Sequence, residues 1–190
     1  MVLPIIGYGH STLRKKAALV THDYPNLQAF IANMFDTMYK AQGVGLAAPQ
    51  VNVSIRLFVV DAAPMEGIVE GSTEVLKGFK KVFINAEILE ESGKEWAFRE
   101  GCLSIPEVRE DVFRKDTIRI KYFDENFVEH EETFSGMKAR VIQHEYDHIE
   151  GLLFVDKISH FRRQIVKSRL VKIQRGEIYT EYPMKFIATR

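Results

Sequence analysis

The chain has 190 residues, and its 26 basic and 26 acidic side chains cancel to a formal net charge of zero. This balance argues against the broad positive field by which proteins hold nucleic acid or an anionic membrane, so we expect a small or neutral partner. Apolar residues make up 46% of the composition, and a chain of this length can bury most of one core. We therefore expect one globular domain over residues 1–190.

The single cysteine, Cys102, excludes an intramolecular disulfide and fits a reducing compartment such as the cytoplasm. The N-terminal segment has no basic residues ahead of its short apolar run and no small-residue cleavage site after a longer one, so we expect no secretion signal. The sequence also contains no apolar run of transmembrane length. We expect a cytoplasmic protein that does not bind membranes.

Residues 25–42 are expected to form an amphipathic helix, because apolar side chains recur at helical spacing between a proline and a glycine. These side chains are Leu27, Phe30, Ile31, Met34, Phe35 and Met38. The next stretch, GVGLAAPQ at 43–50, is too small and glycine-rich for a regular strand, whereas residues 54–61 have the composition of a buried strand. Residues 62–78 contain several glycines and should form a long surface loop.

Four short runs rich in β-branched and aromatic residues follow, at 81–89, 94–100, 116–124 and 126–134. Turn residues at 91–93 separate the first two runs, and the last two should form an antiparallel hairpin. Helical spacing returns at 136–151 and again at about 159–174, while the tail after Gly176 has no assignment. Consecutive strands without helical crossovers predict an α+β fold, with antiparallel sheets packed around a central helix carrying HEYDH, and with an N-terminal and a C-terminal helix.

The stretch QHEYDHIEG, residues 143–151, predicts a metal site on the central helix. Residues four apart lie one turn above each other on a helix face, so His144 and His148 can turn ring nitrogens toward one ion. Glu145 is rotated by about 100° and would stand beside the ion as a general base for bound water. The alternative is a pair of polar residues on an exposed face, which the adjoining apolar residues argue against.

A catalytic site of this kind also needs a third protein ligand and an open position for water. The HExxHxxGxxH pattern of metzincin proteases supplies a last histidine, but this chain has Phe154 there. Other zinc proteases use an acid on a later helix; Asp156 is too close in sequence for that, while Glu177 and Glu181 lie in the tail. Cys102 is a further candidate, although a lone cysteine is more often a small buried apolar residue and a nucleophile paired with histidine is conceivable.

Three segments, taken together, resemble the motifs of the peptide deformylase family. They are GVGLAAPQ at 43–50, EGCLSIPE at 100–107 and QHEYDHIEG at 143–151, in this order and at these separations. The resemblance extends through the neighbouring strands and covers residues 24–158, which leaves the C-terminal helix and tail at 159–190 outside it. The long segment 62–78 and the tail after Gly176 depart from the shorter members of the family.

The resemblance implies that Cys102, His144 and His148 bind one divalent metal ion, with water in the fourth position. The family is known for using Fe²⁺, and Ni²⁺, Co²⁺ or Zn²⁺ can replace it; one thiolate with two imidazoles suits several of these ions. The family's reaction removes the formyl group from the N-terminal formyl-methionine of newly made polypeptides and releases formate. The chain would thus be a metal-dependent hydrolase of protein biosynthesis that processes N-terminal methionine.

The motifs also imply a role for each catalytic group. Metal-bound water attacks the formyl carbon, and Glu145 takes its proton and later returns it to the leaving amine. The side-chain amide of Gln50 and the backbone N–H of Leu103 would donate hydrogen bonds to the oxyanion that forms. Gln50 could otherwise be a solvated polar residue at a strand entrance, but its place at the end of the glycine motif favours catalysis.

The substrate peptide is expected to lie beside the glycine motif, because glycines there leave room for a second backbone. Strand-like pairing would involve Val44 and Gly45, and Gly101 would offer its carbonyl. Val44, Met137, Val141 and the ring of His144 are candidates for the methionine pocket. The glycines could instead form a turn, and Met137 and Val141 could be ordinary core residues.

Two other kinds of function share part of this pattern. A zinc endopeptidase would need a third ligand downstream of His148 and would leave Cys102 and Gln50 without a role. A binding module with a structural metal would need a fourth protein ligand and no general base. The deformylase hypothesis implies a formyl-methionyl peptide as substrate and work near the ribosome's nascent-chain exit; the sequence has no nucleic-acid motif, and we expect a monomer.

Overall fold

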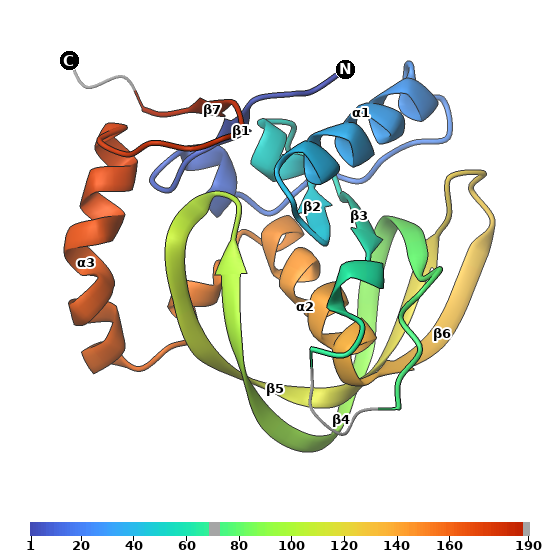
Figure 1. Ribbon diagram of the computed structural model, residues 1–190. Coiled ribbons are helices and arrows are strands. Elements are labelled where there is room, and N and C mark those ends of the chain that lie inside the picture. The colour runs from blue at the N-terminus through green and yellow to red at the C-terminus, as the bar shows by residue number, and fades with distance from the viewer. Residues whose placement is uncertain (69–72, 188–190) are drawn as a thin grey trace.

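The computed structural model describes residues 1–68 and 73–187, and within them five antiparallel strands form the main sheet (Figure 1). In sheet order these strands are β2 (Gly45–Ala47), β3 (Leu57–Asp61), β4 (Lys80–Cys102), β5 (Ile105–Phe123) and β6 (Glu129–Ser135). The helices are α1 (Leu27–Lys40), α2 (Gly136–Ile149) and α3 (His160–Arg175). Short 3₁₀ turns lie at Ser11–Arg14, Ala48–Val51, Ala63–Met65 and Phe154–Asp156. The predicted α+β fold is confirmed.

The three expected helices are present, each within two residues of its predicted ends. The expected hairpin is the antiparallel pair β5 and β6, in which Tyr122 lies opposite His130. Helix α2 lies at the centre, in the concave side of the curved β4–β5 pair, and α1 lies above it (Figure 1). The HEYDH segment is therefore enclosed by sheet, as its apolar neighbours predicted.

The predicted turn at 91–93 is wrong, because β4 runs through it as one long strand with irregular pairing on both sides. Strand β5 likewise begins at Ile105, well before the expected start at 116. Its first half alternates buried and exposed residues, but Glu110 and Arg114 occupy buried positions. Polar side chains at buried positions hide the period-two pattern by which a strand is recognised.

The glycine motif also differs from expectation, since residues 45–47 form the short edge strand β2. It pairs antiparallel with β3, with Gly45 opposite Val60, and a 3₁₀ turn follows at Ala48–Val51. Three residues are too few to show a strand pattern in sequence. The turn places Gln50 in the interior, where its side chain is 1% exposed.

The core lies on both faces of the sheet. On the α2 face, the rings of Phe58 and Phe83 stack with centroids 4.7 Å apart, and the Tyr122 ring packs at a tilt against Phe83 with a centroid distance of 4.4 Å. On the α1 face, Met34 and Met38 pack with strand residues such as Leu57. Burial of these large side chains fixes α1 and α2 against the sheet.

The segment 62–78 was expected to be a surface loop; residues 69–72 of it lie outside the described part of the chain. Its described ends are partly interior, because Ala62 and Leu76 are buried in the α2-side core. Glu74 accepts hydrogen bonds from the backbone N–H groups of Met137 (2.7 Å) and Lys138 (3.1 Å). The Ser135 side chain makes no capping hydrogen bond, so Glu74 caps α2 from a distant segment.

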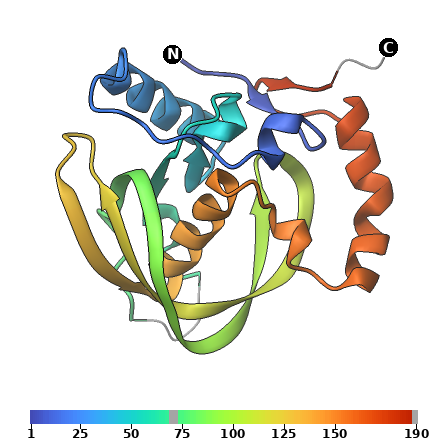
Figure 2. The same ribbon diagram turned by 180° about the vertical axis from the view of Figure 1, so that it is seen from behind.

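The C-terminal tail folds back on the N-terminus. Strand β7 (Met184–Lys185) pairs in parallel with β1 (Ile5–Ile6), so the last described residues lie beside the N-terminal segment (Figure 2). This small sheet is built from segments that are far apart in sequence. Among the described residues, no helix is long and apolar enough to span a membrane.

The cap of α2 can be tested by Glu74→Ala, which removes both acceptor oxygens. The free energy of unfolding should fall by about 1 kcal/mol, the typical value of a helix N-cap, when measured by urea denaturation. Thr73→Ala, at an exposed neighbouring position, serves as the control and should leave it unchanged. Equal stability of the two variants would show that Glu74 is not the cap.

Candidate metal centre

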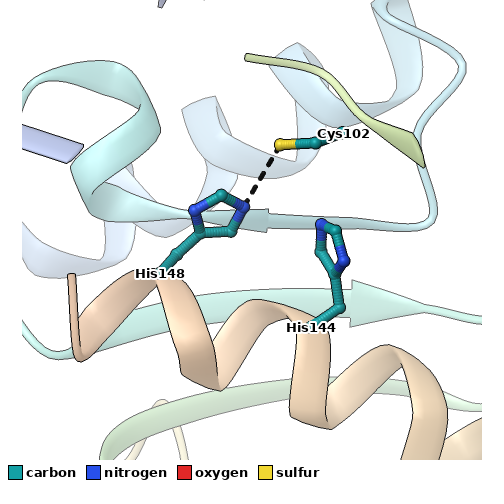
Figure 3. Close-up of side chains that lie close together, drawn as sticks. All are labelled: Cys102, His144 and His148. Carbon is teal, nitrogen blue, oxygen red and sulfur yellow. Dashed lines mark hydrogen bonds between the residues drawn. The ribbon is translucent and has the colours of Figure 1, made fainter. Parts of the chain in front are cut away.

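Three potential metal ligands meet between the end of β4 and one face of α2. Cys102 closes β4, while His144 and His148 project from α2 toward it one helical turn apart (Figure 3). Their ligand atoms all lie within 4.8 Å of one another, and Cys102 Sγ is 3.3 Å from His148 Nε2. The three side chains that the sequence singled out are thus brought together.

A buried ion network holds His144 in place. Glu100 accepts a hydrogen bond at Oε2 from His144 Nδ1 (2.9 Å), two bonds from Arg114 (2.7 and 2.9 Å) and one from Arg140 (2.9 Å). Arg114 also donates to Asp147 (2.7 Å) on the next turn of α2. With Nδ1 bound to Glu100, the Nε2 atom of His144 is the one left to face Cys102.

The protonation of these groups follows from burial and charge. Burial raises the pKa of Glu100, but hydrogen bonds from Arg114 and His144 outweigh it and hold the pKa well below its usual range. Burial lowers the pKa of His144, yet hydrogen bonds to Cys102 and Glu100 raise it well above its usual value. For His148, burial and the charge of His144 lower the pKa, so this imidazole is neutral. Binding of a metal ion to His144 would displace its proton, because imidazole ligands bind in the neutral form.

Glu145 points into the same space. Its side chain is buried, and its Oε2 atom has no hydrogen-bond partner among the described residues. Burial raises its pKa to about 7, although the neighbouring His144 charge lowers it. A Cβ atom on Gly45 would lie 2.7 Å from the Glu145 carboxyl carbon, so this close packing requires a glycine. An unpartnered carboxylate with such a pKa is suited to accept a proton.

Gln50 and Leu103 lie on the other side of Cys102. Gln50 Oε1 accepts from the N–H of Ala47 (2.8 Å), so its Nε2 is directed to Ser104 Oγ (3.3 Å) and Cys102 Sγ (3.5 Å). Leu103 begins the two-residue turn that joins β4 to β5. Both donors that the sequence suggested therefore border the cysteine.

A cavity of about 900 Å³ opens beside these groups. All five predicted substrate contacts line it, namely Val44, Gly45, Gly101, Met137 and Val141. It is also lined by residues that sequence reasoning missed: Met65 and Ile68 from the 62–78 segment, and Tyr182 from the tail. These segments lie outside the three motifs, so no pattern linked them to the site.

The downstream acids considered as third ligands are not part of this group. Asp156 pairs with Arg14, and neither Glu177 nor Glu181 belongs to the ligand cluster. In the described residues the cluster contains no fourth protein donor, which a closed structural site would need. An ion held by these three residues would keep a position free for a further ligand.

The sequence model of the polypeptide deformylase family matches residues 2–164. The chain belongs to this family. Deformylation of nascent polypeptides is the family's function, and its members are metal-dependent hydrolases. The comparisons give no support to a zinc endopeptidase.

Related deformylases match nearly the whole chain. A peptide deformylase from Christiangramia forsetii is 57% identical over 189 residues, covering 98% of this chain and 96% of that protein. One from Flavobacterium johnsoniae is 55% identical over 193 residues, covering 100% and 98%. The crystal structure of a peptide deformylase from Legionella pneumophila is 39% identical, with a TM-score of 0.77, and covers 93% of this chain and 98% of that one. A Plasmodium falciparum deformylase structure is 34% identical, with a TM-score of 0.80 and coverage of 90% and 95%.

Arg114→Met tests the ion network of this deformylase. The change leaves the buried carboxylates of Glu100 and Asp147 without their shared partner, which should lower the free energy of unfolding by about 3–5 kcal/mol in urea. The matched control is Arg119→Met, which removes an exposed arginine paired with Glu131 and should have much less effect. Similar losses in both variants would contradict a structural role for the network.

Proposed function

We propose that this chain removes the formyl group from N-terminal formyl-methionine of new polypeptides, using Cys102, His144 and His148 as metal ligands and Glu145 as the base. One observation carries the proposal: the three ligand atoms meet beside the unpartnered carboxylate of Glu145, at the wall of the cavity. We further propose that residues 1–190 act as one domain.

The residues present fit a divalent ion. Their donors are one thiolate and two imidazoles, a set that suits Fe²⁺, Ni²⁺, Co²⁺ and Zn²⁺, and we propose Fe²⁺ as the ion in the cell. When bound, such an ion lowers the pKa of water and polarises a carbonyl oxygen. Two features around the ligands suit such an ion. Glu145 Oε2 has no hydrogen-bond partner among the described residues, and the hydrogen bond from Nδ1 to Glu100 fixes the orientation of the His144 ring.

The chain's own groups would then move the protons. Glu145 accepts a proton from the attacking water and returns it to the amine as formate leaves. Gln50 Nε2 and the Leu103 N–H donate to the oxyanion of the tetrahedral intermediate. Because Ala47 holds Gln50 Oε1, the donor end of this amide faces Cys102, and an N–H group would turn from Cys102 or Ser104 to the oxyanion.

The substrate backbone would pair with β2. This strand is at the edge of the sheet, bonded to β3 on one side only, so an extended peptide can add to its other side at Val44 and Gly45. Gly101 would accept a hydrogen bond from the peptide. The methionine side chain would then enter the part of the cavity bordered by Met137 and Val141.

We also propose that the protein acts as a monomer in the cytoplasm, at the ribosome. Helix α3 supports this partner because it carries six cations and no acid: Arg162, Arg163, Lys167, Arg169, Lys172 and Arg175. Lys167 and Lys172 are exposed. A helix that concentrates positive charge, on a protein whose net charge is zero, offers a local contact to RNA phosphates.

The first experiment measures formate release from a formyl-Met-Ala-Ser peptide with protein purified anaerobically and analysed for metal. The wild type should carry iron and release formate. Glu145→Gln should retain the metal but lose about 10³-fold in kcat, because the base is lost while the ligands remain.

Cys102→Ala is the matched test of the ligand set and should lose both metal and activity. Chelation of the wild type should abolish release, and addition of Fe²⁺ or Ni²⁺ should restore it. Near-normal turnover of Glu145→Gln would remove this residue as the base. Cleavage of an internal peptide bond without formate release would overturn the proposed function.

Co-sedimentation with ribosomes tests the proposed contact between α3 and the ribosome. The double variant Lys167→Glu/Lys172→Glu should bind several-fold more weakly, and wild-type binding should fall with added salt because phosphate contacts release counterions. The control Lys94→Glu/Lys115→Glu changes two exposed lysines elsewhere and should bind normally. Both double variants should deformylate a short peptide at the wild-type rate; equal ribosome binding would exclude α3.

A further inference from the structure

The turn that carries Leu103 has an unusual geometry for a hairpin. Cys102 pairs with Ile105, so Leu103 and Ser104 form a two-residue connection between β4 and β5. Such connections usually have residues with positive φ, because turn types I′ and II′ match the twist of the strands. Neither Leu103 nor Ser104 has a positive φ. This turn therefore needs support from outside the hairpin.

Three contacts provide that support. The Tyr8 N–H donates to the Ser104 carbonyl (2.9 Å), and Gln50 Nε2 donates to Ser104 Oγ (3.3 Å). The Tyr182 hydroxyl donates to the Leu103 carbonyl (2.8 Å). The Leu103 carbonyl belongs to the central peptide group of the turn, whose rotation distinguishes turn types I and II. Of the three contacts, only that of Tyr182 holds this group.

Tyr182 is placed by the folded tail. The Ile5 N–H donates to the Pro183 carbonyl (2.9 Å), next to Tyr182, and Thr180 Oγ1 donates to the Tyr182 carbonyl (2.8 Å). The ring is partly buried against the α1-side core. Burial raises the pKa of Tyr182, as does the nearby Cys102, so the hydroxyl keeps its proton and remains a donor. The residue lies beyond 2–164, the range that the family model matches.

We propose that Tyr182 is a positioning residue that locks the Leu103–Ser104 turn and so aims the Leu103 N–H at the reacting carbonyl. This inference rests on the proposed function, because it assigns the Leu103 N–H to the oxyanion. Without the hydroxyl, the Leu103 carbonyl loses its partner and the Leu103 backbone is held less firmly. The torsions on either side of the Cys102–Leu103 peptide group, which set the direction of the Leu103 N–H, can then vary. The donor is then misaimed in part of the molecules, although the metal ligands and the base remain.

Tyr182→Phe removes only the hydroxyl. In formate-release assays kcat should fall about 10-fold with KM changed less than about twofold, as expected when an interaction made in the transition state is weakened. Metal content and melting temperature should match the wild type. In zinc-loaded protein, nitrogen relaxation dispersion should reveal new microsecond-to-millisecond exchange at Leu103 and Ser104.

Tyr39→Phe is the matched control, since it also removes one tyrosine hydrogen bond, to Asp61 (2.7 Å), on α1. It should leave kcat and the turn's relaxation unchanged. Wild-type kcat and relaxation in Tyr182→Phe would overturn the inference, as would equal effects in both variants. If the wild type itself released no formate, the proposed function would fail, and the relaxation of the turn would still decide whether Tyr182 locks it.

Discussion

The site depends on the hydrogen bonds and ion pairs made by one buried carboxylate, that of Glu100. It lies near the end of β4 and binds Arg114 of β5 together with Arg140 and His144 of α2. One charged group thus joins the two long strands to the helix that carries both histidines. Because an unpaired charge in the interior is very costly, the network forms only when all these elements are in place, and the ligand geometry follows from the fold.

Much of this arrangement could be predicted from sequence where the relation is local. Two histidines four apart on a helix with an acid between them predict convergence on one ion, and the structure brings them together with Cys102. The first half of β5 was missed because Glu110 and Arg114 stand where apolar residues are expected. Charged residues are normally exposed, so no sequence pattern indicates that Glu100 and Arg114 pair inside the protein.

The remaining contributions come from segments without any motif. Glu74 caps α2 from a loop more than sixty residues upstream, and Tyr182 reaches Leu103 from the tail. Each of these contacts depends on how distant segments pack, which periodicity and propensity do not encode. The centre therefore has two kinds of contributors. The three motifs provide the candidate functional groups, and segments outside the motifs hold them in position.

Gly45 belongs to both the proposed peptide-binding strand and the wall around Glu145. Since a single added methyl group would collide with the carboxylate, no one-step replacement at this position preserves the present packing. In the proposed function, a peptide paired with this strand would lie next to Gly45, whose missing side chain leaves room for the Glu145 carboxylate. In the proposed function, recognition of the chain end and proton transfer would share one reference point. Affinity for different peptides could then change elsewhere in the cavity without altering the distance at which the reaction takes place.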